Sequence, residues 1–168
     1  MNYRTKRDPT FLRNFVFGIE DSLVSTVGLL SGIATGQISR AILISTGLIY
    51  IFVEAFSMAV GSFLSEESAE EYSSGKGVVN GRPIFGAVVM FVSFVIAGLV
   101  PIIPYIFFPT EMQFYGSIIL SIIVLFILGL VNGKLSSSKS WRRALRMAVL
   151  GGFAILVGVL VGKYVKVG

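Results

Sequence analysis

Long apolar runs separated by short polar segments dominate the chain. Five of these runs are long enough to cross a hydrocarbon layer of about 30 Å at roughly 1.5 Å per helical residue. They cover residues 15–37, 42–65, 84–107, 114–132 and 145–165. The pattern predicts an all-α integral membrane protein, in which residues 1–168 form a single membrane domain of five transmembrane helices.

Composition supports a chain that lies in a lipid bilayer. Hydrophobic residues make up 54% of the chain and charged residues only 14%, against about 25% charged residues in soluble domains. The net charge of +5 is compatible with nucleic-acid binding. However, the basic residues occupy short loops between apolar runs and do not follow one soluble face, so we expect no nucleic-acid partner.

Lysine and arginine are distributed unevenly between the two sides of the predicted bundle. The side with the N-terminus and the loops at 66–83 and 133–146 holds eleven of them, and the opposite side holds three. Because cytoplasmic loops are enriched in these residues, we expect a cytoplasmic N-terminus and a C-terminus on the far side. The multi-pass protein would lie in the plasma membrane if its source is prokaryotic.

Cysteine and histidine are absent from the sequence. Disulfides, thiolate zinc sites and cysteine nucleophiles are therefore excluded, and the commonest metal ligand and general base is missing. A metal site must use carboxylates, methionine, hydroxyls, carbonyls and water. We expect no bound cofactor, and an enzyme is the least supported class of function.

One acidic residue, Glu54, lies inside the second apolar run. A carboxylate in hydrocarbon costs at least about 2.5 kcal/mol, so it normally faces a partner, a cavity or a translocated ion. Glu54, Met58 and Gly61 share one face of a helix, with Ser57 and Ser65 close to it. Such a face can line a path for a divalent transition metal. The alternative is a packing methionine beside a protonated acid.

The first apolar run contains two adjacent acids, Glu20 and Asp21, followed by glycines at four-residue spacing. The glycines are Gly28, Gly32 and Gly36. This spacing lets helix backbones approach closely in lipid. We expect the glycine face to bring together the first helices of a homodimer or to pack against the second helix, and packing within the chain is an equal alternative to a dimer seam.

An acidic cluster ends the second apolar run. It consists of Glu66, Glu67, Glu70 and Glu71, which form two pairs spaced by four residues. If the helix continues beyond the membrane, the paired carboxylates repel each other unless cations or protons bind. The cluster is therefore a candidate site of cytoplasmic metal capture, and a solvated helix end is the alternative.

Two segments, FGIEDSLVSTVGLLSGIA and VEAFSMAVGSFLSEES, together resemble the vacuolar iron transporter family. The resemblance is closest over the first two predicted helices and extends loosely over nearly the whole chain. It implies five membrane helices, a homodimer, and export of ferrous iron or manganese from the cytosol by proton antiport. The metal is then a transported substrate.

The resemblance also implies roles for individual residues. Asp21 matches the aspartate of the family's metal path, and Met58 matches its methionine. Plant members carry a glutamate at the position of Tyr50, whereas here Glu54 lies one turn nearer to the methionine on the same face. Glu20 is a possible additional residue. The connection at 66–83 is too short for the glutamate- and methionine-rich cytoplasmic domain of plant members.

Two functional hypotheses from different classes follow. The first is a homodimeric divalent-metal exporter whose path between the first two helices is lined by Asp21, Glu54 and Met58, since a carboxylate can bind either a metal or a proton. The second is a passive cation pore or a structural membrane subunit, whose acids pair with Arg13 or Arg40. Dependence of metal flux on a proton gradient distinguishes them.

Overall fold

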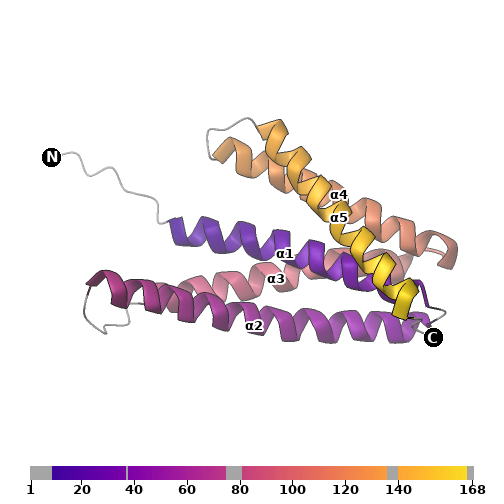
Figure 1. Ribbon diagram of the computed structural model, residues 1–168, viewed down its shortest axis with the longest axis horizontal. Coiled ribbons are helices and arrows are strands. Elements are labelled where there is room, and N and C mark those ends of the chain that lie inside the picture. The colour runs from indigo at the N-terminus through magenta and orange to yellow at the C-terminus, as the bar shows by residue number, and fades with distance from the viewer. Residues whose placement is uncertain (1–8, 37, 75–80, 136–139, 166–168) are drawn as a thin grey trace.

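The computed structural model describes residues 9–36, 38–74, 81–135 and 140–165, which form helices joined by short turns. The α-helices are α1 (Pro9–Ala34), α2 (Arg40–Ser74), α3 (Arg82–Phe107), α4 (Thr110–Leu135) and α5 (Ser140–Val165) (Figure 1). All of them are long and apolar enough to cross a membrane. The structure thus confirms the predicted all-α class and its five spanning helices.

The second helix is much longer than the predicted span at 42–65. It has 35 residues, which correspond to about 52 Å at the rise of an α-helix and exceed the thickness of a hydrocarbon layer. The segment 66–74 follows the predicted span and belongs to the same helix, which confirms that the stretch from Ser45 to Tyr72 forms one long helix, as its sequence predicts. The acidic cluster lies on this extension. This is the condition under which its paired carboxylates were expected to repel each other. The first helix, α1, ends at Ala34, three residues before the end of the predicted span 15–37.

The helices form a bundle in which α1 and α3 are the most embedded elements. α3 packs against α1, α2 and α4, and α1 packs against α3, α5, α4 and α2. Of the helix pairs in contact, α1 and α2 share the smallest contact. α2 is therefore held mainly by α3, and the surface between α1 and α2 is open to other groups.

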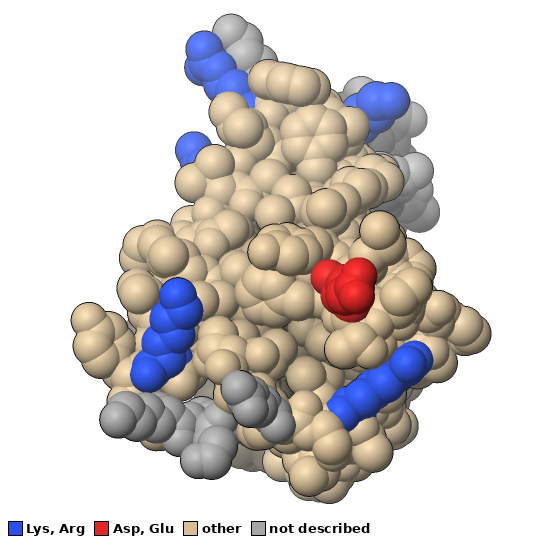
Figure 2. All heavy atoms as spheres, turned by 90° about the vertical axis from the view of Figure 1, so that its right-hand side faces the viewer, with Lys and Arg blue, Asp and Glu red and all other residues tan. Residues whose placement is uncertain are grey.

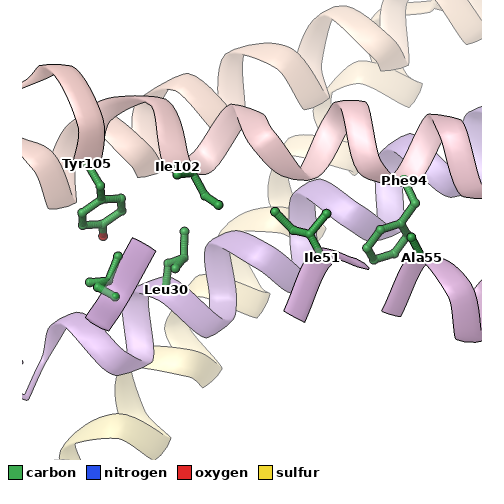
Figure 3. Close-up of a cluster of buried hydrophobic side chains, with 7 residues drawn as sticks. Leu30, Ile51, Ala55, Phe94, Ile102 and Tyr105 are labelled. Carbon is green, nitrogen blue, oxygen red and sulfur yellow. The ribbon is translucent and has the colours of Figure 1, made fainter. Parts of the chain in front are cut away.

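A cluster of buried apolar side chains joins α1, α2 and α3. It includes Leu30, Ile51, Phe94 and Ile102, whose side chains point toward one another between the three helices (Figure 3). Each of them is at most 1% exposed. Close packing of this kind holds membrane helices together, because burial from water supplies no driving force between helices in lipid.

The glycine face of α1 packs against α5 of the same chain, which crosses it in Figure 1. A Cβ atom added at Gly32 would lie 2.7 Å from the carbonyl oxygen of Gly158, and one at Gly28 would lie 3.3 Å from that of Ala154. The structure thus has α5 at the place where the sequence analysis expected α2 or a second copy of α1. Gly36 lies beyond α1, in the turn that follows it.

The outer faces of the helices are largely apolar, as expected for side chains in contact with lipid. Exposed residues include Phe56 on α2 and Phe153 on α5, with 66% and 64% of their surface accessible. Figure 2 views the end where α2 begins and α5 ends, and its charged side chains are separated by wide uncharged surface. Polar chemistry therefore concentrates between helices.

Candidate functional site

A polar seam runs between α1 and α2, which lie antiparallel. On α1, Asp21 and Ser25 are one turn apart, and on α2, Tyr50 and Glu54 are one turn apart. The Tyr50 hydroxyl lies near the Ser25 side chain, and the two carboxylates are close enough to interact electrostatically. All four residues are half-buried. The structure therefore brings together the two acids that the sequence analysis singled out.

Ser22 fixes the position of α1 beside this seam. Its hydroxyl donates a hydrogen bond of 2.6 Å to the carbonyl oxygen of Phe94 on α3, and the side chain is fully buried. Gly98 permits this approach, since a Cβ atom there would lie 2.8 Å from the Ser22 oxygen. The contact orients the adjacent Asp21 toward α2 because neighbouring residues of a helix point in different directions.

A cleft of about 750 Å³ lies on the side of the acid pair that faces the N-terminus of α1. Its lining residues come from three helices and are Arg13, Asn14, Phe17, Ser57, Met58, Gly61, Ser62, Ser65 and Met90. The predicted face of α2, with Met58 and Gly61, forms one wall. The cleft leads to a point one helical turn from Glu54.

Two polar contacts cross the seam beside this cleft. The Ser62 hydroxyl donates a hydrogen bond of 3.1 Å to the Asn14 side-chain oxygen. Farther from the acid pair, the Arg13 guanidinium forms an ion pair with Glu66. Glu66 is the less exposed partner, with 12% of its side chain accessible against 62% for Arg13. The ion pair therefore joins α1 and α2 at the outer end of the cleft.

The acidic cluster is divided by this ion pair. Glu66 has a cationic partner from α1, while Glu67 and Glu70 are half-buried and Glu71 is exposed. Over the described part of the chain, no group of three or more acidic side chains is arranged to hold a metal ion. The cluster thus provides negative charge along α2 and does not form a preorganised metal cage.

The two basic residues named as possible partners of the membrane acids interact elsewhere. Arg13 pairs with Glu66, and Arg40 donates a hydrogen bond to the carbonyl oxygen of Ile106. Neither of these two interactions involves Asp21 or Glu54. The ion pairing suggested for a purely structural subunit therefore exists at the end of the seam and does not neutralise the central acids.

Glu20 faces away from the α1–α2 seam. It lines a separate cavity of about 300 Å³ with Arg13, Phe17 and Asn132, among others, on the side of α1 that faces α4. The Asn132 side-chain oxygen accepts a hydrogen bond of 3.4 Å from Arg143 of α5. Glu20 still interacts electrostatically with Asp21. The structure thus separates two acids that are adjacent in sequence.

Four residues of the cleft were not identified from the sequence: Asn14, Phe17, Ser62 and Met90. Asn14 lies two turns before Asp21, and Ser62 lies one turn after Met58. Helical spacing therefore places Asn14 on the face of Asp21 and Ser62 on the face of Met58. Met90 lies within an uninterrupted apolar run of α3. No local pattern distinguishes it, because its place in the cleft depends on how α3 packs against α1 and α2.

A comparison with protein-family models finds the VIT family, matched over residues 12–77 and 73–163. Vacuolar iron transporter 1 of Arabidopsis thaliana is 20% identical, with 92% of this chain and 86% of the relative covered. The protein of the same name in Eucalyptus grandis is 22% identical over the same shares. Vacuolar iron transporter homolog 4 of Arabidopsis thaliana is 29% identical, with 88% of this chain and 84% of the relative covered.

The lengths of these alignments differ in an informative way. The alignments with both proteins named vacuolar iron transporter 1 span 215 positions, whereas this chain has 168 residues. The alignment with homolog 4 spans 167 positions. The longer relatives therefore contain residues without a counterpart here, which agrees with the short form expected from the connection at 66–83.

Proposed function

This chain belongs to the VIT family, and we propose that it exports ferrous iron or manganese from the cytosol in exchange for protons. Metal transport agrees with the names of its relatives. The choice of these two metals, the direction of export and the proton antiport form the proposal. The path runs along the α1–α2 seam and includes Asp21, Glu54 and Met58.

The observation that carries this proposal is the electrostatic interaction between two carboxylates on the two helices of the seam. Asp21 and Glu54 interact electrostatically at a half-buried position within membrane-spanning helices. Two negative charges in a medium of low dielectric constant repel each other strongly. A divalent cation relieves this repulsion, and so does protonation. A carboxylate that carries a proton cannot also bind the metal ion. The pair therefore has a physical basis for exchanging a metal for protons.

The cleft supports entry from the cytoplasm. It lies toward the N-terminal end of α1, the side that carries eleven of the fourteen lysines and arginines. Glu66, Glu67, Glu70 and Glu71 extend from the same end and raise the local concentration of cations. In this proposal they capture metal, Met58 and the acid pair bind it in the path, and Glu20 adds negative charge from the other side of α1.

A homodimer is part of the proposal, and the exposed face of α2 is its best-supported surface. Ile49, Phe52, Val53 and Phe56 on this face are between 53% and 66% exposed. The glycine face of α1 is covered by α5 and is unavailable to a second copy. Because the chain has no cysteine, cross-linking of Val53→Cys between copies tests this surface, with Phe153→Cys on α5 as the control.

Metal flux and internal pH recorded together in proteoliposomes test the transport mechanism. We expect Asp21→Asn and Glu54→Gln each to reduce metal flux steeply and to abolish metal-driven proton movement, since each amide keeps the size of the side chain and loses the charge. Glu111→Gln, an exposed acid at the start of α4, is the matched control. Wild-type flux and coupling in both amide variants would contradict the proposed path.

The same measurement distinguishes an exchanger from a passive cation pore. In a pore, the wild-type protein conducts metal at a rate that does not depend on an imposed pH gradient. In an exchanger, an outward-directed metal gradient drives protons in the opposite direction. Flux of iron or manganese without proton movement would therefore retain the metal path and remove the antiport from the proposal.

A further inference from the structure

We propose that Met90 of α3 is a second thioether ligand in the cytoplasmic cleft and that, with Met58 of α2, it forms a site for soft transition-metal ions. This inference rests on the proposed function, because it adds a step before the acid pair on the same path. The site would bind the ion through sulfur and then release it to Asp21 and Glu54. Hard cations such as Mg²⁺ and Ca²⁺ would gain little from it.

The two methionines approach the same cleft from different helices. Met58 lies one turn beyond Glu54 on α2. On α1, Gly18 lies one turn before Asp21, and the sulfur of Met90 packs against this glycine. A Cβ atom at Gly18 would lie only 3.2 Å from that sulfur. Both thioethers therefore lie about one helical turn from the acid pair, on its cytoplasmic side.

The charge of the cleft favours the same conclusion. Among its described lining residues the charged side chain is Arg13, whose charge is balanced by the ion pair with Glu66, and the other polar groups are hydroxyls and the Asn14 amide. Mg²⁺ and Ca²⁺ prefer carboxylate and carbonyl oxygens, and Mg²⁺ gives up its bound water reluctantly. Thioether sulfur is neutral and polarisable, and it selects softer ions. The cleft thus offers little to hard cations before the carboxylates are reached.

Packing alone gives a different expectation for Met90. Its side chain is 2% exposed, and methionine commonly fills irregular gaps in protein cores. In that case replacement by leucine, which keeps volume and apolar character, would change stability slightly and metal binding not at all. The test must therefore measure metal binding itself.

Silver ion is a suitable probe because Ag⁺ is soft and has high affinity for thioether sulfur. Calorimetric titration of the purified full-length protein with Ag⁺ compares Met58→Leu, Met90→Leu and the double variant with the wild type. We expect each single change to weaken Ag⁺ binding by roughly tenfold or more. Met147→Leu is the control, since Met147 is a buried methionine of α5 that lies outside the cleft.

Wild-type affinity for Ag⁺ in Met90→Leu would overturn the inference, whatever the result for Met58→Leu. Gly18→Ala provides a second test if Met90→Leu folds poorly, because the added methyl group would crowd the Met90 sulfur, the Met90 carbonyl oxygen and the Ser93 Cβ atom, and so move this part of α3 away from α1. We expect weaker Ag⁺ binding in this variant as well. Unchanged binding in Gly18→Ala would also contradict a ligand role for Met90.

A transport measurement connects the site to selectivity. We expect Met90→Leu to raise the half-saturation concentration for ferrous iron several-fold and to make iron flux more sensitive to excess Mg²⁺, while Met147→Leu resembles the wild type. Failure of the proposed function would appear separately, as wild-type transport in Asp21→Asn and Glu54→Gln. Iron selectivity that is identical in Met90→Leu and the wild type would contradict the inference even if the acid pair is essential.

Discussion

Tyr50 lies beside two carboxylates, at the position where the resemblance to plant vacuolar iron transporters implies a glutamate. Its hydroxyl lies near Ser25 of α1, and it interacts electrostatically with Asp21 and Glu54. A tyrosine cannot replace the negative charge of a glutamate at neutral pH. Glu54, one turn away on the same helix, supplies a carboxylate instead. The hydroxyl of Tyr50 joins α1 to α2 and restricts how the two acids face each other.

We predict that Tyr50→Phe weakens metal binding without abolishing it. The change removes the hydroxyl that lies near Ser25 across the seam and keeps the aromatic ring, and a polar contact of this kind contributes about 1 kcal/mol. This corresponds to a rise of roughly fivefold in the half-saturation concentration for metal flux. Tyr115→Phe, at an exposed tyrosine of α4, is the matched control. Equal half-saturation values in the two variants would show that the hydroxyl does not organise the acids.

Residue positions on a single helix were predictable from the sequence, whereas contacts between helices were not. Helical spacing placed Met58 on the face of Glu54, and the structure has Met58 in the cleft beside that face. The bonds from Arg13 to Glu66 and from Ser62 to Asn14 depend on the relative register of α1 and α2. The periodicity of a single helix contains no information on how far it is shifted along its neighbour. These contacts could therefore not be predicted from the sequence.

At the scale of helices, the close approach of α1 and α5 distinguishes this bundle from one held by large side chains. Glycines on both helices contribute, including Gly28 and Gly32 on α1 and Gly158 and Gly162 on α5. The spacing of small residues correctly indicated a close contact in lipid. It did not identify the partner, because α5 carries the same spacing as α1 and a second copy would offer an equivalent face.

We predict that Gly32→Leu destabilises the bundle by forcing α1 and α5 apart. A Cβ atom at this position would lie 2.7 Å from the Gly158 carbonyl oxygen, and overpacking of this kind typically costs about 1–3 kcal/mol. The temperature of unfolding in detergent should fall accordingly. Gly152→Leu on α5 is the control, because a Cβ atom there meets no atom within 4 Å. Equal stability of the two variants would show that the contact between α1 and α5 at Gly32 contributes little to the stability of the bundle.

The helical extension of α2 also has a testable consequence. Arg13 already forms an ion pair with Glu66, so Glu67 and Glu71 are the members of the acidic cluster whose replacement tests its charge. We predict that Glu67→Gln and Glu71→Gln combined raise the half-saturation concentration for metal more than they reduce maximal flux, since they alter local ion concentration outside the barrier. The effect should disappear at high salt, where surface charge is screened. Equal kinetics at low and high salt would favour a merely solvated helix end.

For the whole molecule, hydropathy predicted the number of spanning helices correctly because each apolar run must satisfy its own backbone hydrogen bonds in lipid. The residues at which helices end were harder to predict, since a helix can continue beyond its apolar run, as α2 does to Ser74. The orientation in the membrane is a separate matter. It depends on the distribution of lysine and arginine, and the fold alone is compatible with either orientation.

We predict that the start of α1 and the end of α2 face the cytoplasm, while the α3–α4 connection and the end of α5 face the opposite side. The eleven-to-three distribution of lysine and arginine sets this orientation, since transfer of positive loops across the membrane is disfavoured. The absence of cysteine makes single substitutions unique labelling sites. Ser68→Cys on α2 and Tyr164→Cys on α5, both at exposed positions, should react with an impermeant thiol reagent from opposite sides of sealed vesicles. Labelling of both from the same side would contradict an odd number of spans, and labelling of Tyr164→Cys from the cytoplasm alone would reverse the proposed direction of metal entry into the cleft.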